Sequence, residues 1–172
     1  MGRLTLVTGG AGSGKSRYAL DLAASWGTRI LFIATCVPGD DEMRSKVARH
    51  RAERPPGWAT VEANRGLGEA LRPGHDGAVI DCLTLLVSQM LVANENDDVI
   101  LREVSDTCDA ARRADYPCVL VTNEVGCGLV PESSLGRRFR ELAGRCNQVA
   151  ARCASDVKLI VCGIPVCVKN DS

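Results

Sequence analysis

A glycine-rich segment at residues 9–16 constrains the fold of this chain more than any other feature. It reads Gly-Gly-Ala-Gly-Ser-Gly-Lys-Ser and fills every fixed position of the G-x-x-x-x-G-K-S pattern of phosphate-binding loops. A short apolar, β-rich run at 4–8 precedes it, and a segment with apolar residues at helical spacing, 15–26, follows it. The motif requires this order of strand, loop and helix, because the loop amides and the helix N-terminus together face the phosphates. The segment therefore predicts a nucleotide-phosphate site rather than an ordinary glycine turn.

The residue types in the loop indicate what each part does. Glycines allow backbone torsions closed to other residues and let the main chain approach an anion. Lys15 is expected to reach the β- and γ-phosphates, and the Ser16 hydroxyl is expected to bind Mg²⁺. The residues predicted to contact the nucleotide here are Gly9, Gly10, Ala11, Gly12, Ser13, Gly14, Lys15 and Ser16.

Strand and helix patterns alternate along the rest of the chain. Apolar runs predict strands at 4–8, 29–35, 58–62, 78–81, 118–122, 158–162 and 164–168. Helical patterns cover 15–26, 40–53, 66–71, 83–94, 98–114 and 133–153. This alternation predicts an α/β fold with a mostly parallel sheet and helices on both faces. We expect residues 1–172 to form a single domain like those of P-loop NTPases.

Composition narrows the functional class. Lys and Arg together number 21 and Asp and Glu number 21, so the balance of charge argues against a protein built to coat nucleic acid or an anionic membrane. No apolar run approaches the ~20 residues of a membrane span. The nine cysteines include no C-x-x-C pair, and we interpret them as reduced thiols of a cytoplasmic enzyme.

Two carboxylates are expected at the carboxyl ends of buried strands, where ligands bind in such sheets. Asp81 is a candidate Mg²⁺ ligand, directly or through water, and its alternative role is a helix N-cap. Glu124 is a candidate metal ligand, base for a hydroxyl, or contact for a polar group of the substrate. The alternative for Glu124 is an ion pair with an arginine of the 133–153 helix.

His50 lies on a polar, arginine-rich helix, and a lone histidine on such a helix is usually just solvated. A neutral imidazole is nevertheless a good nucleophile that can take up a phosphoryl or nucleotidyl group. His75, in a loop, is expected to be incidental.

Four arginines of the 133–153 helix either form a solvated face, in which Glu141 would pair with Arg137, or hold phosphates or cross a subunit boundary. These are Arg137, Arg138, Arg140 and Arg145.

Segments spread over nearly the whole chain resemble one enzyme family, and they occur in family order. They are the loop at 8–16, Ile-Ala-Thr at 33–35, Asp-Asp-Glu-Met at 40–43, Arg-His-Arg-Ala-Glu-Arg-Pro at 49–55, Val-Thr-Asn-Glu-Val-Gly at 121–126, residues 138–148 and Gly-Ile-Pro at 163–165. The chain resembles the bifunctional adenosylcobinamide kinase / adenosylcobinamide-phosphate guanylyltransferases of cobalamin biosynthesis. The Asn-Glu-Val-Gly segment and the helix that carries the histidine are more specific to this family than the loop.

The resemblance implies a reaction sequence. Such enzymes phosphorylate adenosylcobinamide with a nucleoside triphosphate, ATP or GTP, and Mg²⁺, and then transfer GMP from GTP onto that phosphate through a covalent histidine. The matching histidine is His50, and Lys15 and Glu124 complete the expected catalytic set. By the same matching, the guanine nucleotide site includes Ile33, Ala34, Thr35, Arg51, Ala52, Glu53, Arg54, Glu62 and Asp81. Family members form trimers, so a homo-oligomer is implied.

Two other functions are compatible with the same loop. One is a P-loop small-molecule kinase without the histidine step. The other is a nucleotide-binding switch with no small-molecule chemistry, against which His50 and Glu124 supply more chemistry than a switch needs.

Overall fold

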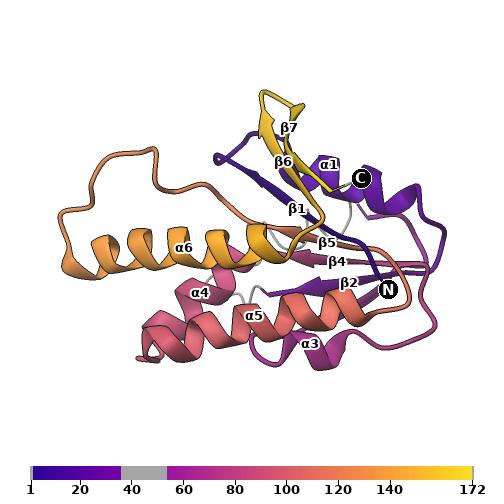
Figure 1. Cartoon of the computed structure of the whole chain (residues 1–172), viewed down its shortest axis with the longest axis horizontal. Coiled ribbons are helices and arrows are strands. Elements are labelled where there is room, and N and C mark those ends of the chain that lie inside the picture. Colours follow the sequence, from indigo (N-terminus) through magenta and orange to yellow (C-terminus); the bar gives the residue numbers. More distant parts are fainter. Residues whose placement is uncertain (1, 36–53, 172) are drawn as a thin grey trace.

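The computed structural model describes residues 2–35 and 54–171 (Figure 1). In chain order its elements are β1 (Leu4–Gly9), α1 (Lys15–Ala24), β2 (Ile30–Ala34), β3 (Ala59–Glu62), α3 (Leu67–Ala70), β4 (Gly77–Asp81), α4 (Leu83–Val92), α5 (Asp97–Arg113), β5 (Cys118–Val121), α6 (Ser134–Cys153), β6 (Asp156–Val161) and β7 (Ile164–Asn170). No helix in these two ranges is both long and apolar enough to cross a bilayer.

The strands form one sheet in the order β3-β2-β4-β5-β1-β6-β7. All neighbouring pairs are parallel except β6 and β7, which are antiparallel. The N-terminal strand β1 lies inside the sheet between β5 and β6, so the loop that follows it leaves from the centre of the carboxyl edge.

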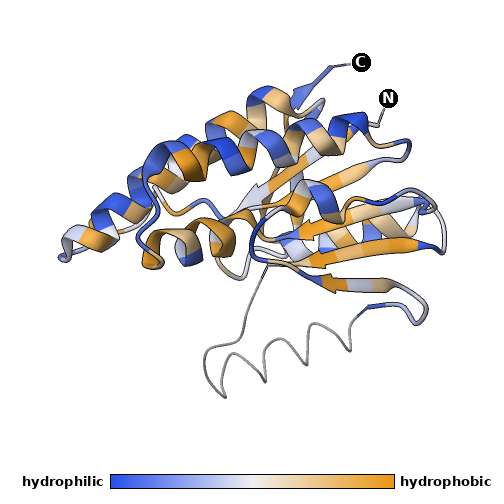
Figure 2. Ribbon diagram, turned by 90° about the horizontal axis from the view of Figure 1, so that it is seen from below, coloured by the Kyte–Doolittle hydropathy of each residue, from blue (hydrophilic) through white to orange (hydrophobic). Residues whose placement is uncertain are grey.

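Helices cover both faces of this sheet, which confirms the predicted α/β architecture. Helix α1 packs on one face against buried side chains such as Val7, Phe32 and Val79. Helices α3, α4, α5 and α6 pack on the other face against Leu6, Ile80 and their neighbours. Figure 2 shows hydrophobic residues gathered on the strands and hydrophilic residues alternating with them along the long helices.

Burial explains why the inner strands are apolar almost throughout. All five residues of β2 are buried, as expected for a strand covered on both faces. Burying an aliphatic or aromatic side chain of this size contributes roughly 1.5–3 kcal/mol. The three strands β2, β4 and β5 are therefore a rigid support for the loops at their carboxyl ends.

The predicted elements agree with the observed ones to within a few residues. The predicted helix at 15–26 ends earlier, at Ala24, because Ser25 caps it. The prediction for 164–168 extends to Asn170 and forms a hairpin with β6. The predicted helix at 40–53 lies outside the described residues.

The hairpin turn is a tight one at Cys162 and Gly163. Both residues have positive φ, 52° and 80°, as two-residue hairpin turns of the favoured hand require. The outer strand β7 is exposed along most of its length, including the apolar Ile164, Val166 and Val168.

Candidate functional site

The phosphate-binding loop joins β1 to α1, as its sequence predicts. Gly14 is the N-cap of α1 with φ of 92°, and Gly12 has φ of 70°, so both use the left-handed region that favours glycine. A Cβ added to Gly10 or Gly12 would meet nothing within 4 Å. This side of the loop is therefore open to a ligand.

The positions of two side chains of the loop, Lys15 and Ser13, suit the binding of an anion. Lys15 is only 8% exposed, and its Nζ donates to the Gly10 carbonyl at 3.2 Å, across the loop. The Ser13 hydroxyl is buried and has no hydrogen-bond partner among the described residues. A buried hydroxyl without a partner costs free energy that a phosphate oxygen would recover. Ser16 is half-buried in the first turn of α1.

The β6–β7 turn supports the back of the loop. The Gly163 amide donates to the Ser13 carbonyl at 2.8 Å. A Cβ added to Gly14 would lie 3.2 Å from the Gly163 Cα, so the two backbones are in close contact. The β6–β7 hairpin therefore packs directly against the loop and fixes its backbone.

Asp81 ends β4 at the same edge of the sheet. Helix α4 begins at Leu83 with Cys82 as its N-cap, so the alternative role of Asp81 as the N-cap is wrong. The cause is that the β4 backbone stays extended through Cys82, with φ of −139° and ψ of 155°.

Thr35 ties the ends of β2 and β4 together. Its hydroxyl accepts from the Cys82 amide at 2.8 Å and donates to the Cys82 carbonyl at 2.7 Å. Its amide donates to the Asp81 carbonyl at 3.1 Å, and its carbonyl accepts from Gln89 Nε2 at 2.8 Å. These bonds fix the backbone that carries the Asp81 carboxylate.

Lys15 and Asp81 both influence the pKa of the buried Cys82 thiol. Burial first, and the Asp81 carboxylate second, raise the pKa of Cys82 to about 12, and the Lys15 ammonium opposes both. Lys15 of the loop and Asp81 of β4 therefore both lie near Cys82, at the carboxyl edge of the sheet.

These residues fit a magnesium nucleotide. Mg²⁺ prefers oxygen ligands and usually keeps several waters and phosphate oxygens. The Ser16 hydroxyl and the Asp81 carboxylate supply oxygen atoms of this kind, and their role as Mg²⁺ ligands stays a prediction. Within the described ranges no group of three or more histidine, cysteine or acidic side chains is arranged to hold a metal, so the nucleotide and water would complete the shell.

Glu124 is held directly beside the loop. Its amide donates to the Gly9 carbonyl at 3.0 Å, and its Oε1 accepts from the Gly126 amide at 2.7 Å. It forms no ion pair with an arginine of the described chain, so that alternative for Glu124 is wrong. The arginines of α6 instead bond to Asp97 and to backbone carbonyls.

A partly buried polar network at Thr122 and Asn123, just before Glu124, is not predicted by the sequence. Thr84 Oγ1 accepts from the Asn123 amide at 2.7 Å and lies 3.2 Å from Thr122 Oγ1. Asn147 of α6 accepts from the Thr122 hydroxyl at 2.7 Å, and its Nδ2 donates to the Asn123 carbonyl at 3.1 Å. The network anchors Thr122 and Asn123, which directly precede Glu124, to both α4 and α6.

Comparison with known proteins identifies the family. The family model described as cobinamide kinase / cobinamide phosphate guanyltransferase, CobU, matches residues 5–168. The chain belongs to this family. Two curated relatives, each named bifunctional adenosylcobalamin biosynthesis protein CobU, are 39% identical in Escherichia coli K12 and 40% identical in Salmonella typhimurium, over 96% of this chain and 99% of each relative. The bifunctional adenosylcobalamin biosynthesis protein CobP of Pseudomonas aeruginosa is 36% identical over 96% of this chain and 97% of that protein.

Several residues predicted to contact guanine nucleotide in this kinase and guanyltransferase family lie around the carboxyl end of β2. Ile33 and Ala34 are buried at the end of the strand, and Thr35 is fully buried with the bonds described above. Glu62 is exposed at the end of β3. Their contacts with nucleotide stay predictions.

Arg54 marks the end of the predicted histidine-bearing segment. Its guanidinium lies 3.5 Å from the centroid of the Phe32 ring, and its Nη1 donates to Thr60 Oγ1 at 3.2 Å. These contacts fix Arg54 on β2 and β3. His50, Arg51, Ala52 and Glu53 lie outside the described residues.

Sequence patterns alone did not reveal Gln89 and Asn147 as supports of this site. Both act on residues far away in the chain, Thr35 and the 122–123 segment. The signal available for Asn147 was its place in a helix segment that resembles the family, and Gln89 had none.

Proposed function

We propose that this chain catalyses both reactions of its family in cobalamin biosynthesis. It phosphorylates adenosylcobinamide with a nucleoside triphosphate, and it then transfers GMP from GTP to the new phosphate, giving adenosylcobinamide-GDP and pyrophosphate. The observation that carries the proposal is the bond between the Glu124 amide and the Gly9 carbonyl. It joins the segment typical of this family to the phosphate-binding loop in a single site.

In the kinase reaction the chain positions the donor and accepts a proton. The loop amides and Lys15 hold the triphosphate. The hydroxyl oxygen of the acceptor bonds to the γ-phosphorus while the bond from that phosphorus to the β-phosphate oxygen breaks. The Glu124 carboxylate takes the hydroxyl proton, and the nucleoside diphosphate leaves.

Ser16 and Asp81 would hold Mg²⁺ in this reaction, directly or through water. The ion would neutralise negative charge on the phosphates of the donor. The bonds of Thr35 to Cys82 and Asp81 keep the carboxylate at the edge of the sheet.

In the guanylyl transfer the nucleophile is His50. Its imidazole nitrogen bonds to the α-phosphorus of GTP while the bond to the pyrophosphate oxygen breaks, giving a phosphoramidate. A phosphate oxygen of the acceptor then bonds to the same phosphorus, and the imidazole leaves. The neighbouring Arg51 and Arg54 carry charge that suits the departing pyrophosphate.

The decisive test is covalent labelling with GTP that carries a labelled α-phosphate. The wild-type chain should gain an acid-labile label, and His50→Ala should lose it while still phosphorylating adenosylcobinamide. A label retained in His50→Ala would contradict the assignment of the nucleophile. Phosphorylation without any labelling of the wild type would identify a single-function kinase. Nucleotide hydrolysis that does not depend on corrinoid would identify a nucleotide-binding switch.

We also propose that residues 1–172 act as one cytoplasmic domain that assembles into a homo-oligomer, a trimer by the resemblance. Apolar side chains exposed along the β6–β7 hairpin, Val161, Ile164, Val166 and Val168, support an interface there. Light scattering of the purified chain would measure the assembly, and a monomer at micromolar concentration would contradict it.

A further inference from the structure

A cavity outside the phosphate-binding loop is rich in arginine. It lies between the first half of α6 and the segment that follows β5, and its volume is about 440 Å³. Its lining includes Gly126, Val130, Arg137, Arg140, Arg145 and Gln148.

Two of these arginines form no ion pair with any carboxylate of residues 2–35 and 54–171. Arg137 Nη1 donates to the carbonyls of Pro131 and Glu132 at 3.2 and 2.5 Å. Arg140 Nη2 donates to the Gly126 carbonyl. Glu141 also lines the cavity but forms no ion pair with Arg137 among the described residues, so that part of the solvated-face alternative is wrong.

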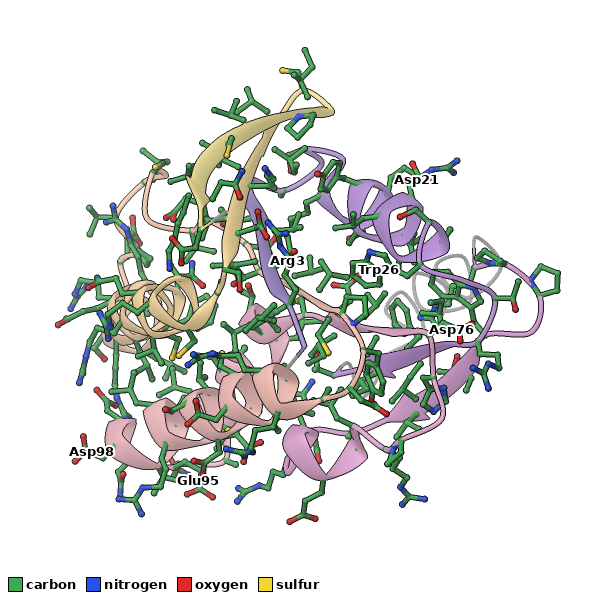
Figure 3. All side chains as sticks on the ribbon, turned by 45° about the vertical axis from the view of Figure 1, so that its right-hand side comes forward. Arg3, Asp21, Trp26, Asp76, Glu95 and Asp98 are labelled. Atoms are coloured by element: carbon green, nitrogen blue, oxygen red, sulfur yellow. The ribbon has the colours of Figure 1, made fainter. Side chains whose placement is uncertain are left out.

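The other arginines of α6 show the contrast. Arg138 and Arg145 pair with Asp97 at 2.7 and 3.2 Å. In Figure 3, Asp98 and Glu95 mark the end of α5 where this pairing occurs. Arg137 and Arg140 are instead oriented by backbone carbonyls, which fix a guanidinium without neutralising it.

The cavity adjoins the candidate base. The Gly126 carbonyl accepts from Arg140, and the Gly126 amide donates to Glu124 Oε1. Glu124 in turn bonds to Gly9 of the loop. A molecule whose hydroxyl lies at Glu124 therefore has Arg140 as a close neighbour.

The cavity also has an exposed apolar side chain in its lining. Val130 is 65% exposed, and its neighbour in the chain, Leu129, is 96% exposed. Exposed apolar side chains beside guanidinium groups that the described chain bonds through backbone carbonyls suit a ligand that combines a large, partly apolar body with a phosphate.

We propose that this cavity binds the phosphate of the phosphorylated acceptor, with Arg137 and Arg140 donating to its oxygens. This proposal rests on the proposed function and adds to it a binding site for the phosphorylated intermediate. The acceptor has a neutral hydroxyl before the kinase reaction and a phosphate monoester after it. Arginine forks recognise that group, so the cavity retains the intermediate between the two reactions.

The test compares phosphorylated and unphosphorylated adenosylcobinamide as ligands of the full-length chain. Their dissociation constants are measured by equilibrium dialysis, with the corrin absorbance as the readout. In Arg137→Gln and Arg140→Gln the preference for the phosphorylated form should fall by at least ~10-fold, because each removes charge-assisted hydrogen bonds. Arg140→Lys keeps the charge without the fork and should restore part of the preference.

Arg138→Gln is the matched control, because Arg138 lies on the same helix but pairs with Asp97. An equal loss of preference in Arg138→Gln would overturn the proposal, since general surface charge would then explain the binding. An unchanged preference in both Arg137→Gln and Arg140→Gln would also overturn it. Thermal melts of each variant show whether it is folded.

Labelling by GTP separates this inference from the proposed function. Lost labelling in these variants with the preference retained would assign the cavity to a phosphate of the nucleotide instead, and would refute the inference. Absence of labelling in the wild-type chain would refute the proposed guanylyl transfer, whereas the dialysis result would still decide the cavity.

Discussion

Replacing Thr35 by valine tests the connection between β2 and β4 with almost no change in side-chain volume. The hydroxyl of this fully buried residue is bonded to both backbone groups of Cys82. Without it the Cys82 amide is left unsatisfied, at a cost of ~1–3 kcal/mol. The Cys82 carbonyl keeps a bond from Leu86, so its loss is the ordinary ~0.5–1.5 kcal/mol. The sum is about 1.5–4.5 kcal/mol, or roughly 3–18 °C in Tm for a chain of this size.

Thr107→Val is the matched control for this substitution. Thr107 is 1% exposed, and its hydroxyl has no hydrogen-bond partner among the described residues. Removing a buried hydroxyl without a partner should leave stability unchanged or raise it by up to ~1 kcal/mol. Urea unfolding of both variants measures the difference in free energy of unfolding. Equal destabilisation by the two substitutions would refute the reasoning, because burial alone would then set the cost.

Three further predictions concern thiols, the loop and pH. Burial raises the pKa of four thiols to about 12, and these should resist alkylation in the native chain: Cys82, Cys108, Cys118 and Cys146. Mass spectrometry should find the label on the exposed thiols instead: Cys127, Cys162 and Cys167. Gly14→Ala should weaken nucleotide binding by ~10-fold or more, because a Cβ at φ of 92° would press on Gly163, whereas Gly128→Ala enters open space and should bind normally in calorimetry. Hydrogen bonds from Arg29 lower the pKa of Asp76 below its ordinary 3.8, so this carboxylate stabilises the fold above that pH and loses the effect as pH falls through the lowered value. Asp76→Asn should therefore unfold more easily than wild type at pH 7, with a gap that closes in acid, and a gap that persists there would contradict the assignment.

The elements predicted best are those with a local signal. The glycine spacing at 9–16 and the apolar run before it fix a loop between a strand and a helix, because the physical requirements lie within a dozen residues. For the β6–β7 hairpin the sequence predicted the two strands but not their antiparallel pairing. The available signal was an Xaa-Gly pair between two apolar runs, which favours a two-residue turn.

The supports of the site had no such signal. Thr35 bonds to Cys82, 47 residues away, and Thr84 lies against Thr122, 38 residues away. Contacts of this kind depend on how strands are ordered in the sheet, which apolar periodicity does not reveal. The residues proposed for chemical roles could therefore be named from the sequence, and those roles stay predictions, whereas the residues that hold the loop and the strand ends in place became visible only in the fold.

The central position of β1 has a consequence for synthesis of the chain. The nucleotide loop is made first, but β1 pairs with β5 and β6, and the carbonyl of Ser13 receives its bond from Gly163. A growing polypeptide that has not yet released residues 156–163 from the ribosome lacks these partners. We therefore expect the 9–16 loop to reach its final structure late in translation. A proteolytic cut near residue 155 would separate this loop from β6 and Gly163, although the cut lies near the other end of the polypeptide.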